Sequence, residues 1–206
     1  MLWPLRPVQS ARHSIEPADG RAVVTIEHAP LPGVTPEMLG WWYGHVPGTM
    51  RYAGAVWPRY LVWHPLDHIS YRVERPGPAG TGSVRAGTRL AITEALGRDP
   101  RMLLDIRVAV EEVSAERAVV AKRVAGTAVV RLENEFHKGP DGARYTTRLS
   151  IGDTTVLGRL LLNRVARTRA FPPRKILPWI RHHVEEVGNL EHFLPDLFRK
   201  RADHEQ

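Results

Sequence analysis

Two short segments, far apart in the chain, carry histidine and carboxylate side chains close together. Residues 63–68 read WHPLDH, and residues 181–186 read RHHVEE. If the second segment is helical, His182 and Glu186 lie on one helix face, with their Cβ atoms about 5–6 Å apart. Imidazole and carboxylate groups at that spacing can chelate one metal ion. An exposed ion pair would show the same spacing, and His183 with Glu186 is a competing pair three residues apart.

The upstream segment follows a short apolar run, Tyr60–Trp63, which we predict as a strand. Pro65 cannot donate a hydrogen bond to a sheet and would end this strand. His64 would then lie at the mouth of a cavity, although a turn or core histidine is the alternative. Asp67 has three candidate roles: a turn former, a partner that orients a metal-bound histidine, or a direct contact to substrate.

Two further candidate regions lie in the middle of the chain. Alternation in Leu90–Leu96 places Glu94 on one strand face with three aliphatic side chains. A carboxylate there is costly unless it is paired or bound to a metal, whereas a register shift or an edge position would leave it in water. His137 ends a predicted strand and could act as a general acid or base, or be a surface residue. Tyr145, across the following turn, could face the same space.

The elements that position these residues are mostly strands. Apolar and β-branched patterns predict strands at 21–28 and 69–74, and then five strands in succession from residue 89. The connections between those five are too short for crossover helices, so they predict an antiparallel meander. The five strands are Arg89–Leu96, Met102–Val110, Arg117–Ala125, Thr127–His137 and Ala143–Ile151. Residues 1–20, 47–59 and 75–88 are predicted to be irregular, because proline and glycine interrupt them.

Helices are predicted near the beginning and at the end of the chain. Thr35 as N-cap and Pro36 in the first turn predict a helix that carries Trp41 and Trp42. After residue 152, the segments 156–169, 176–187 and 190–199 are compatible with helices, with Gly188 ending the second. Helices packed on one curled antiparallel sheet form an α+β fold. We predict a single domain over residues 1–206, with an irregular segment at 1–20 and the sheet and helices within 21–206.

Composition excludes several classes of protein. The 206 residues include no cysteine and no apolar run long enough for a membrane span, and the N-terminus lacks a signal-peptide core. These features favour the cytoplasm. The net charge of +7 comes from arginines spread along the chain, whereas nucleic-acid footprints are usually clustered and interleaved with aromatics. We therefore expect neither a membrane nor a nucleic acid as partner. Motifs of serine hydrolases, NTPases and dehydrogenases are absent.

Three segments together resemble the diacetylphloroglucinol hydrolases and the related phloretin hydrolases. They are residues 38–43 (MLGWWY), 61–68 (LVWHPLDH) and 182–195, within a resemblance that spans roughly residues 30–200. It implies a Bet v 1-like (START-like) helix-grip fold, in which a curved antiparallel sheet wraps a long C-terminal helix. It also implies a zinc ion held by two histidines and two glutamates. By motif and strand position these would be His64, Glu94, His182 and Glu186.

The implied reaction is hydrolysis of the carbon–carbon bond between an acyl group and a phenolic ring, in a diacetylphloroglucinol-like or related polyketide substrate. The ring carbon must be protonated, and His137, Tyr145 or a zinc-bound water could do this. Asp67 would contact the substrate. An aromatic-lined substrate pocket would include Trp41, Trp42, Trp57 and Trp63. A non-catalytic carrier of hydrophobic ligands with the same fold is the alternative. The better-known relatives are longer at the N-terminus, which leaves substrate and oligomeric state open, a homodimer included.

Overall fold

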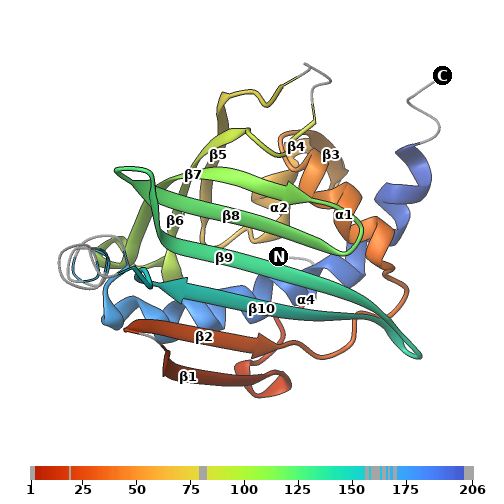
Figure 1. Cartoon of the computed structure of the whole chain (residues 1–206). Coiled ribbons are helices and arrows are strands. Elements are labelled where there is room, and N and C mark those ends of the chain that lie inside the picture. The colour runs from red at the N-terminus through yellow and green to blue at the C-terminus, as the bar shows by residue number, and fades with distance from the viewer. Residues whose placement is uncertain are drawn as a thin grey trace.

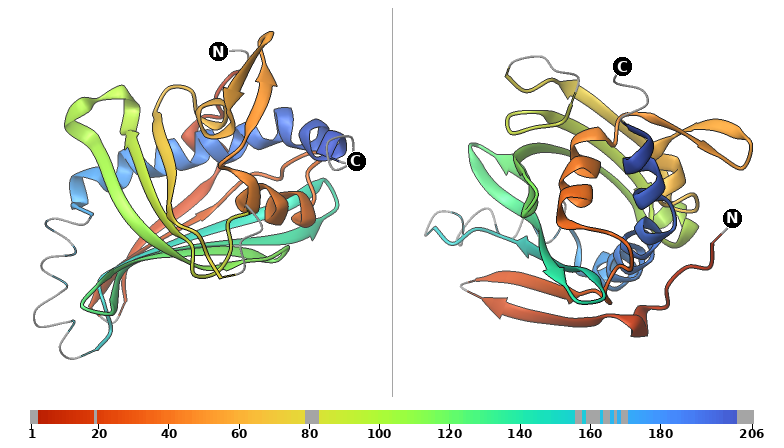
Figure 2. Two further views of the ribbon diagram at one scale, coloured as in Figure 1. Left: turned by 90° about the horizontal axis from the view of Figure 1, so that it is seen from above. Right: turned by 90° about the vertical axis from the view of Figure 1, so that its right-hand side faces the viewer.

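One antiparallel sheet and one long helix dominate the structure. The computed structural model describes residues 3–18, 20–78, 83–155 and 171–201, with the single residues 158, 163, 166 and 168. The sheet has eight strands in the order β1-β2-β10-β9-β8-β7-β6-β5. It curls around helix α4, Ile176–Lys200, as Figures 1 and 2 show. The predicted α+β helix-grip architecture is therefore confirmed. No helix within the described ranges is long and apolar enough to cross a membrane.

Seven of the eight predicted strands are present, with ends that differ by a few residues; the exception is Tyr60–Trp63. An eighth strand, β1, lies at the sheet edge and was predicted to be irregular. It is amphipathic only weakly and contains Pro17, which an edge strand tolerates because one of its sides needs no hydrogen bonds. The strands of the sheet are β1 Arg12–Ala18, β2 Arg21–Glu27, β5 His68–Arg75, β6 Arg89–Ala95, β7 Leu103–Val113, β8 Arg117–Val124, β9 Thr127–Gly139 and β10 Gly142–Ile151.

The segment before the first histidine cluster differs from the prediction. Residues 47–59 form a hairpin of strands β3, Thr49–Tyr52, and β4, Ala55–Pro58, rather than an irregular loop. The apolar run that follows is helix α2, Arg59–Trp63, rather than a strand. A run of four or five apolar residues has no periodicity that separates the two. The helical turn changes the direction in which the chain enters residues 64–68.

Helix α4 is continuous over 25 residues, although we predicted that Gly188 would end it. The reason for the glycine is the N-terminal segment that crosses the helix there. A Cβ atom on Gly188 would lie 2.5 Å from Cδ of Arg6. Arg6 donates hydrogen bonds to the carbonyls of Ala29 and Pro30 and pairs with Glu191. The glycine thus permits a close approach and does not mark a helix end. The helix predicted over 156–169 lies mostly outside the described residues.

Two hydrophobic clusters pack against successive parts of α4. Trp179, Ile180 and Val184 belong to the first cluster, which also fills the space over β2 and β10. Val187 and Leu190 belong to the second, together with aromatic residues of α2 and of helix α1, Pro36–His45. Buried polar side chains of α4 lie between the two clusters: His182, His183, Glu185, Glu186 and Asn189. A polar site is thereby enclosed between two apolar regions.

Helix α1, Pro36–His45, docks closely on the turn between β7 and β8. Its predicted N-cap is confirmed, because the Thr35 hydroxyl accepts a hydrogen bond from the Met38 amide at 3.3 Å. Gly40 faces that turn: a Cβ there would lie 2.4 Å from the backbone oxygen of Ser114. By contrast, a Cβ on Gly44 would meet its nearest atom, the Val84 oxygen, at 3.7 Å.

We expect Gly40→Ala to destabilise the protein, because the helix must move away from the turn; overpacking of this kind costs about 1–3 kcal/mol. Gly44→Ala is the matched control. It has room for the methyl group and gains helix propensity, worth up to about 1 kcal/mol. Urea unfolding of both variants measures the difference. Equal stability of the two variants would show that α1 is not held against the turn.

Candidate metal centre

Four buried side chains from three elements converge beside α4. They are His68 at the start of β5, Glu94 on β6, and His182 and Glu186 on α4. His68 Nε2 lies 3.3 Å from Glu186 Oε2 and 3.9 Å from Glu94 Oε1. His182 Nε2 lies 3.6 Å from Glu94 Oε2 and 3.9 Å from Glu186 Oε2. Two imidazole nitrogens and two carboxylates thus surround one small volume.

Local structure explains this convergence. His182 and Glu186 are four residues apart on a helix and share a face, as predicted. His68 and Glu94 are direct partners across the antiparallel pair β5–β6, and side chains of such partners lie on the same face of a sheet. The helix lies across that face, so two local regularities produce one site.

The hydrogen bonds of His68 leave one ring nitrogen available. Its Nδ1 lies 2.7 Å from the Tyr60 carbonyl oxygen, so Nδ1 carries the proton and donates. Nε2 is then unprotonated, and it is buried with no hydrogen-bond partner among the described residues. The ring is also held flat against the Tyr60 ring, 3.8 Å away between centroids. An orphaned, oriented lone pair that faces two carboxylates is what a metal ligand requires.

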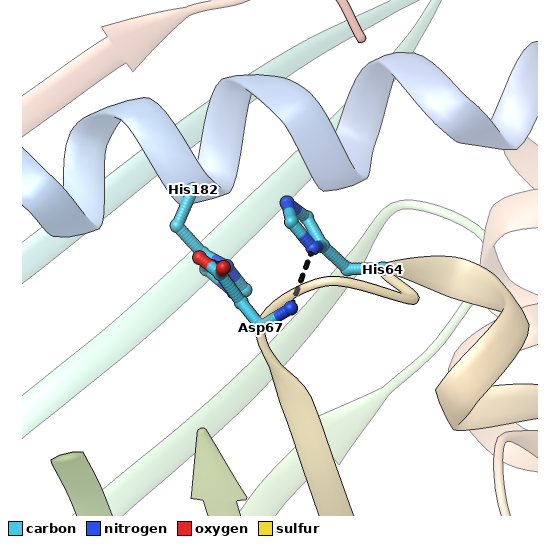
Figure 3. Close-up of side chains that lie close together, drawn as sticks. All are labelled: His64, Asp67 and His182. Atoms are coloured by element: carbon cyan, nitrogen blue, oxygen red, sulfur yellow. Dashed lines mark hydrogen bonds and ion pairs between the residues drawn. The ribbon is translucent and has the colours of Figure 1, made fainter. Parts of the chain in front are cut away.

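His182 is oriented in the same way by Asp67. Its Nδ1 donates to Asp67 Oδ2 at 3.1 Å, which directs Nε2 towards the two glutamates. Burial alone would lower the pKa of His182, but Glu94, Asp67 and Glu186 raise it to about 9. This rise shows that the site strongly favours positive charge. Figure 3 shows His182 on α4 beside Asp67 and His64.

Asp67 is itself fixed from the other side. Its carboxylate accepts hydrogen bonds from the backbone amides of Gly97 and Arg98, at 2.8 and 3.1 Å. Burial opposes the charge of this group, but the hydrogen bonds from His182 and Gly97 lower its pKa to about 2. Asp67 therefore acts as an ionised anchor between the loop after β6 and His182. Of the roles we considered, the geometry matches a partner that orients a histidine.

His64 lies near this cluster but uses both of its ring nitrogens in other contacts. Nδ1 accepts a hydrogen bond from the Asp67 amide at 3.2 Å, the dashed line in Figure 3. Nε2 therefore carries the proton, and it donates to Glu185 Oε2 at 3.1 Å. His64, Asp67 and His182 do offer atoms within 4.8 Å of one another. Those atoms already bind each other or neighbours, so the structure places His68, rather than His64, with the other three predicted ligands.

A hydrogen-bonded network that we did not predict holds Glu186. His183 Nδ1 donates to Glu186 Oε1, so the competing pair three residues apart also forms. Burial raises the pKa of Glu186, but His183 and His182 more than offset this and hold it well below its usual value. His183 Nε2 lies 3.0 Å from Thr147 Oγ1, and the network continues through Asn134.

The other predicted catalytic residues occupy different environments. Tyr145 is buried and its hydroxyl is hydrogen-bonded to that of Tyr43, which Asn134 also contacts. It therefore reaches the site only through the network behind Glu186. His137 is exposed on β9, with Nε2 4.0 Å from Glu135 Oε2, because the strand turns the preceding Phe136 inward. That exposure separates His137 from the buried cluster, contrary to the pocket position that we considered for it.

One tyrosine hydroxyl touches the site directly, a role that the sequence analysis did not predict for it. Tyr60 donates to Glu94 Oε1 at 2.7 Å. Burial and the charge of Glu94 raise the pKa of Tyr60 well above its usual value, so the hydroxyl keeps its proton. Tyr60 is therefore a buried proton donor in direct contact with a candidate ligand.

Helices α2 and α4 are tied together next to the site. Trp63 Nε1 donates to the Glu186 carbonyl oxygen at 2.8 Å, and Asn189 Nδ2 donates to the Trp63 carbonyl oxygen at 2.9 Å. These two reciprocal bonds fix the end of α2 against the middle of α4. The position of residues 64–68 relative to the helix is thereby set.

A small cavity opens on the sheet side of the cluster. Its polar lining comes from Glu94, Lys122, His182, His183 and Glu186, and the rest is aliphatic side chains of β6 to β10 with Phe171 and Trp179. Its volume is about 80 Å³. The four tryptophans predicted for the pocket are not among its described lining residues. Trp42 and Trp63 are core residues, Trp57 is 46% exposed, and Trp41 lines a separate groove.

The donor set fits a divalent metal ion such as zinc. Zinc binds imidazole nitrogen and carboxylate oxygen, and its histidine ligands commonly donate their other N–H to a carboxylate or a backbone carbonyl. His182 and His68 meet this second condition with Asp67 and with the Tyr60 carbonyl. Their free nitrogens and the Glu94 carboxylate lie within 4.8 Å of one another.

Comparison with known proteins adds a family and two similar structures. The family model described as "DAPG hydrolase PhiG domain" matches residues 15–199. Phloretin hydrolase of Eubacterium ramulus is 25% identical over 203 residues, which cover 90% of this chain and 70% of that protein. Among solved structures, Ara h 8.0201 has a TM-score of 0.49 at 10% identity, covering 84% of this chain and 99% of the other. Protein Ms6760 from Mycobacterium smegmatis has a TM-score of 0.49 at 12% identity, covering 87% and 96%.

Proposed function

The chain belongs to the DAPG hydrolase PhiG domain family, and on that premise we propose that it is a zinc-dependent hydrolase. Its reaction would cleave the carbon–carbon bond between an acyl group and a phenolic ring. The observation that carries the proposal is the buried set His68, Glu94, His182 and Glu186, in which His68 Nε2 has no other described partner. The similarity to phloretin hydrolase supports an acylated phenol as substrate.

Zinc bound by these four residues would supply Lewis acidity towards oxygen atoms of the substrate. The chain's own groups supply the rest. Hydrolysis adds a hydroxyl group to the acyl carbon and a proton to the ring carbon, so the site needs a proton donor. Tyr60 is protonated, buried and adjacent to Glu94, and we assign it this role ahead of Tyr145 and His137.

The cavity beside the cluster has an apolar lining that suits an aromatic substrate, but it is too small to hold one. Its aliphatic lining would exclude water from the reacting carbon. Its volume of about 80 Å³ is well below the roughly 300–1,000 Å³ of sites for drug-sized ligands. Binding of an acyl-phenol therefore requires the side chains between sheet and helix to move apart.

Metal analysis combined with product analysis tests the proposal. We expect about one zinc ion per purified chain, because one set of four ligands binds one ion. Incubation with phloretin or diacetylphloroglucinol should release the deacylated phenol and the carboxylic acid in equal amounts, and removal of zinc should abolish the release. Metal-free protein that binds these compounds without cleaving them would contradict the proposal and favour a ligand carrier.

Removal of the Tyr60 hydroxyl should separate catalysis from metal binding. We expect Tyr60→Phe to keep its zinc but to lower kcat by about 10²–10⁴-fold, the usual contribution of a general acid. Tyr71→Phe is the matched control, since Tyr71 packs against the Tyr60 ring at 5.1 Å but is not hydrogen-bonded to Glu94. Steady-state kinetics and zinc content of both variants provide the measurement. An unchanged kcat for Tyr60→Phe would rule out this role.

A further inference from the structure

A second, larger concavity lies away from the metal centre. It is formed where the N-terminal segment, α1, the β3–β4 hairpin and the last turns of α4 meet, a region visible in Figure 2. None of its described lining residues belongs to the metal cluster or to the cavity beside it. Its volume is about 410 Å³, within the range of roughly 300–1,000 Å³ for small-molecule sites.

Aromatic rings form much of this groove. Trp3 stacks on His192 and Phe193, with centroids 5.5 and 5.7 Å apart, and tilts against Tyr52 at 5.1 Å. On another wall, Trp41 stacks on His45 at 4.7 Å. Both tryptophans are only partly buried, so part of each indole remains open to a ligand. Flat, fixed rings of this kind recognise other planar rings.

The charge of the groove is strongly positive. Its described lining contains four basic side chains and one carboxylate, that of Asp196, which already pairs with Arg199 at 2.8 Å. The basic side chains are Arg51, Arg59, Lys200 and Arg201. Arg59 is held in place by the carbonyls of His45 and Thr49 and lies over Trp41.

Two of these cations remain available for a ligand. Arg51 is exposed on β3 and Lys200 is exposed in the last turn of α4, and neither side chain has a hydrogen bond or ion pair with any described residue. Each can therefore donate charge-assisted hydrogen bonds to an anionic group of a ligand.

We propose that this groove is a binding site for a small aromatic anion. The ring would lie against the indoles of Trp3 and Trp41, and the carboxylate or phosphate would face Arg51 and Lys200. The inference rests on the groove alone and does not depend on the proposed hydrolase activity.

Calorimetric titration with three matched probes tests the site. The probes are 3-phenylpropionate, its neutral analogue 3-phenylpropan-1-ol, and propionate, which lacks the ring; phenyl phosphate distinguishes phosphate from carboxylate as the preferred anion. We expect saturable binding of at least one aromatic anion, and several-fold weaker binding of both the alcohol and propionate. Equal affinity of 3-phenylpropan-1-ol and 3-phenylpropionate, or no binding of either aromatic anion at millimolar concentration, would overturn the proposal.

Variants locate the binding. The double variant Arg51→Gln with Lys200→Gln should weaken aromatic-anion binding by about tenfold or more, as loss of charged hydrogen bonds does. Arg72→Gln is the control, because Arg72 is exposed on β5 and does not line the groove. Binding that is lost in His68→Ala but kept in the double variant would place the anion at the metal cluster and contradict the proposal. The proposal would also be contradicted if the double variant had a different oligomeric state in solution from the unmodified protein. That result would identify the groove as an interface between two copies of the chain.

Discussion

Replacing His68 by alanine is expected to abolish zinc binding, whereas replacing His64 by alanine should leave the zinc in place. The two histidines are four residues apart in one motif, so they form a matched pair. His68 directs an unpaired Nε2 at Glu186 and Glu94, while His64 uses both nitrogens in bonds to Asp67 and Glu185. For His68→Ala, loss of zinc affinity should exceed the roughly 10–100-fold that loss of an outer-shell partner costs.

Zinc content after dialysis against a chelator, together with kcat on an acyl-phenol, measures this difference. Both variants remove a buried ring, so circular dichroism must first show that each is folded. Zinc retained by His68→Ala and lost by His64→Ala would show that the motif-based assignment of His64 was right and that the rings rearrange when metal binds.

The second large effect is expected for Asp67→Asn, which should weaken zinc binding by about 10–100-fold. The carboxylate accepts three hydrogen bonds, from Gly97, Arg98 and His182. An asparagine has one oxygen, and its NH₂ group would face at least one of these donors. Either the loop after β6 would loosen, or His182 would lose the bond that directs its Nε2 towards the two glutamates.

Asp99→Asn serves as the control for this variant. Asp99 also accepts a backbone amide hydrogen bond, from Arg101 at 2.9 Å, but it has no contact with the metal cluster. A competition titration with a fluorescent zinc chelator gives both affinities. Urea unfolding of the zinc-free proteins should also show Asp67→Asn to be less stable, by about 1–3 kcal/mol for an unsatisfied buried donor. If Asp67→Asn and Asp99→Asn bind zinc equally, Asp67 does not orient His182.

Much of the fold could be predicted because its regularities are local. The alternation that places Glu94 inward on β6 and the spacing that aligns His182 with Glu186 both follow from the backbone period of one element. Strand β1 could not be predicted, because an edge strand needs neither an apolar face nor freedom from proline. The role of Gly188 could not be predicted either, because the residue that needs its missing side chain is Arg6, far away in sequence.

The choice between His64 and His68 shows where local patterns fail for the site. It depends on α2 being a helix and on the turn that follows it, and the run Tyr60–Trp63 does not distinguish a helix from a strand. One signal was nevertheless present. Residues 69–74 were predicted as a strand. In the structure this strand pairs with the Glu94 strand and starts one residue earlier, which places His68 opposite Glu94. The roles of Tyr60 and His183 appear only in three dimensions.

The contacts of α4 with residues 63–94 determine when the metal site can form during synthesis of the chain. The candidate ligands come from residues 68–94 and from 182–186. Most strands of the sheet lie between these two segments in sequence, so they must be synthesised before the ligands can meet. Contacts of such long sequence separation form late and slowly. A ribosome-bound chain that has not released α4 therefore has half of the ligands and no site. Zinc would then be captured only by the completed fold, and its binding would stabilise that fold by mass action.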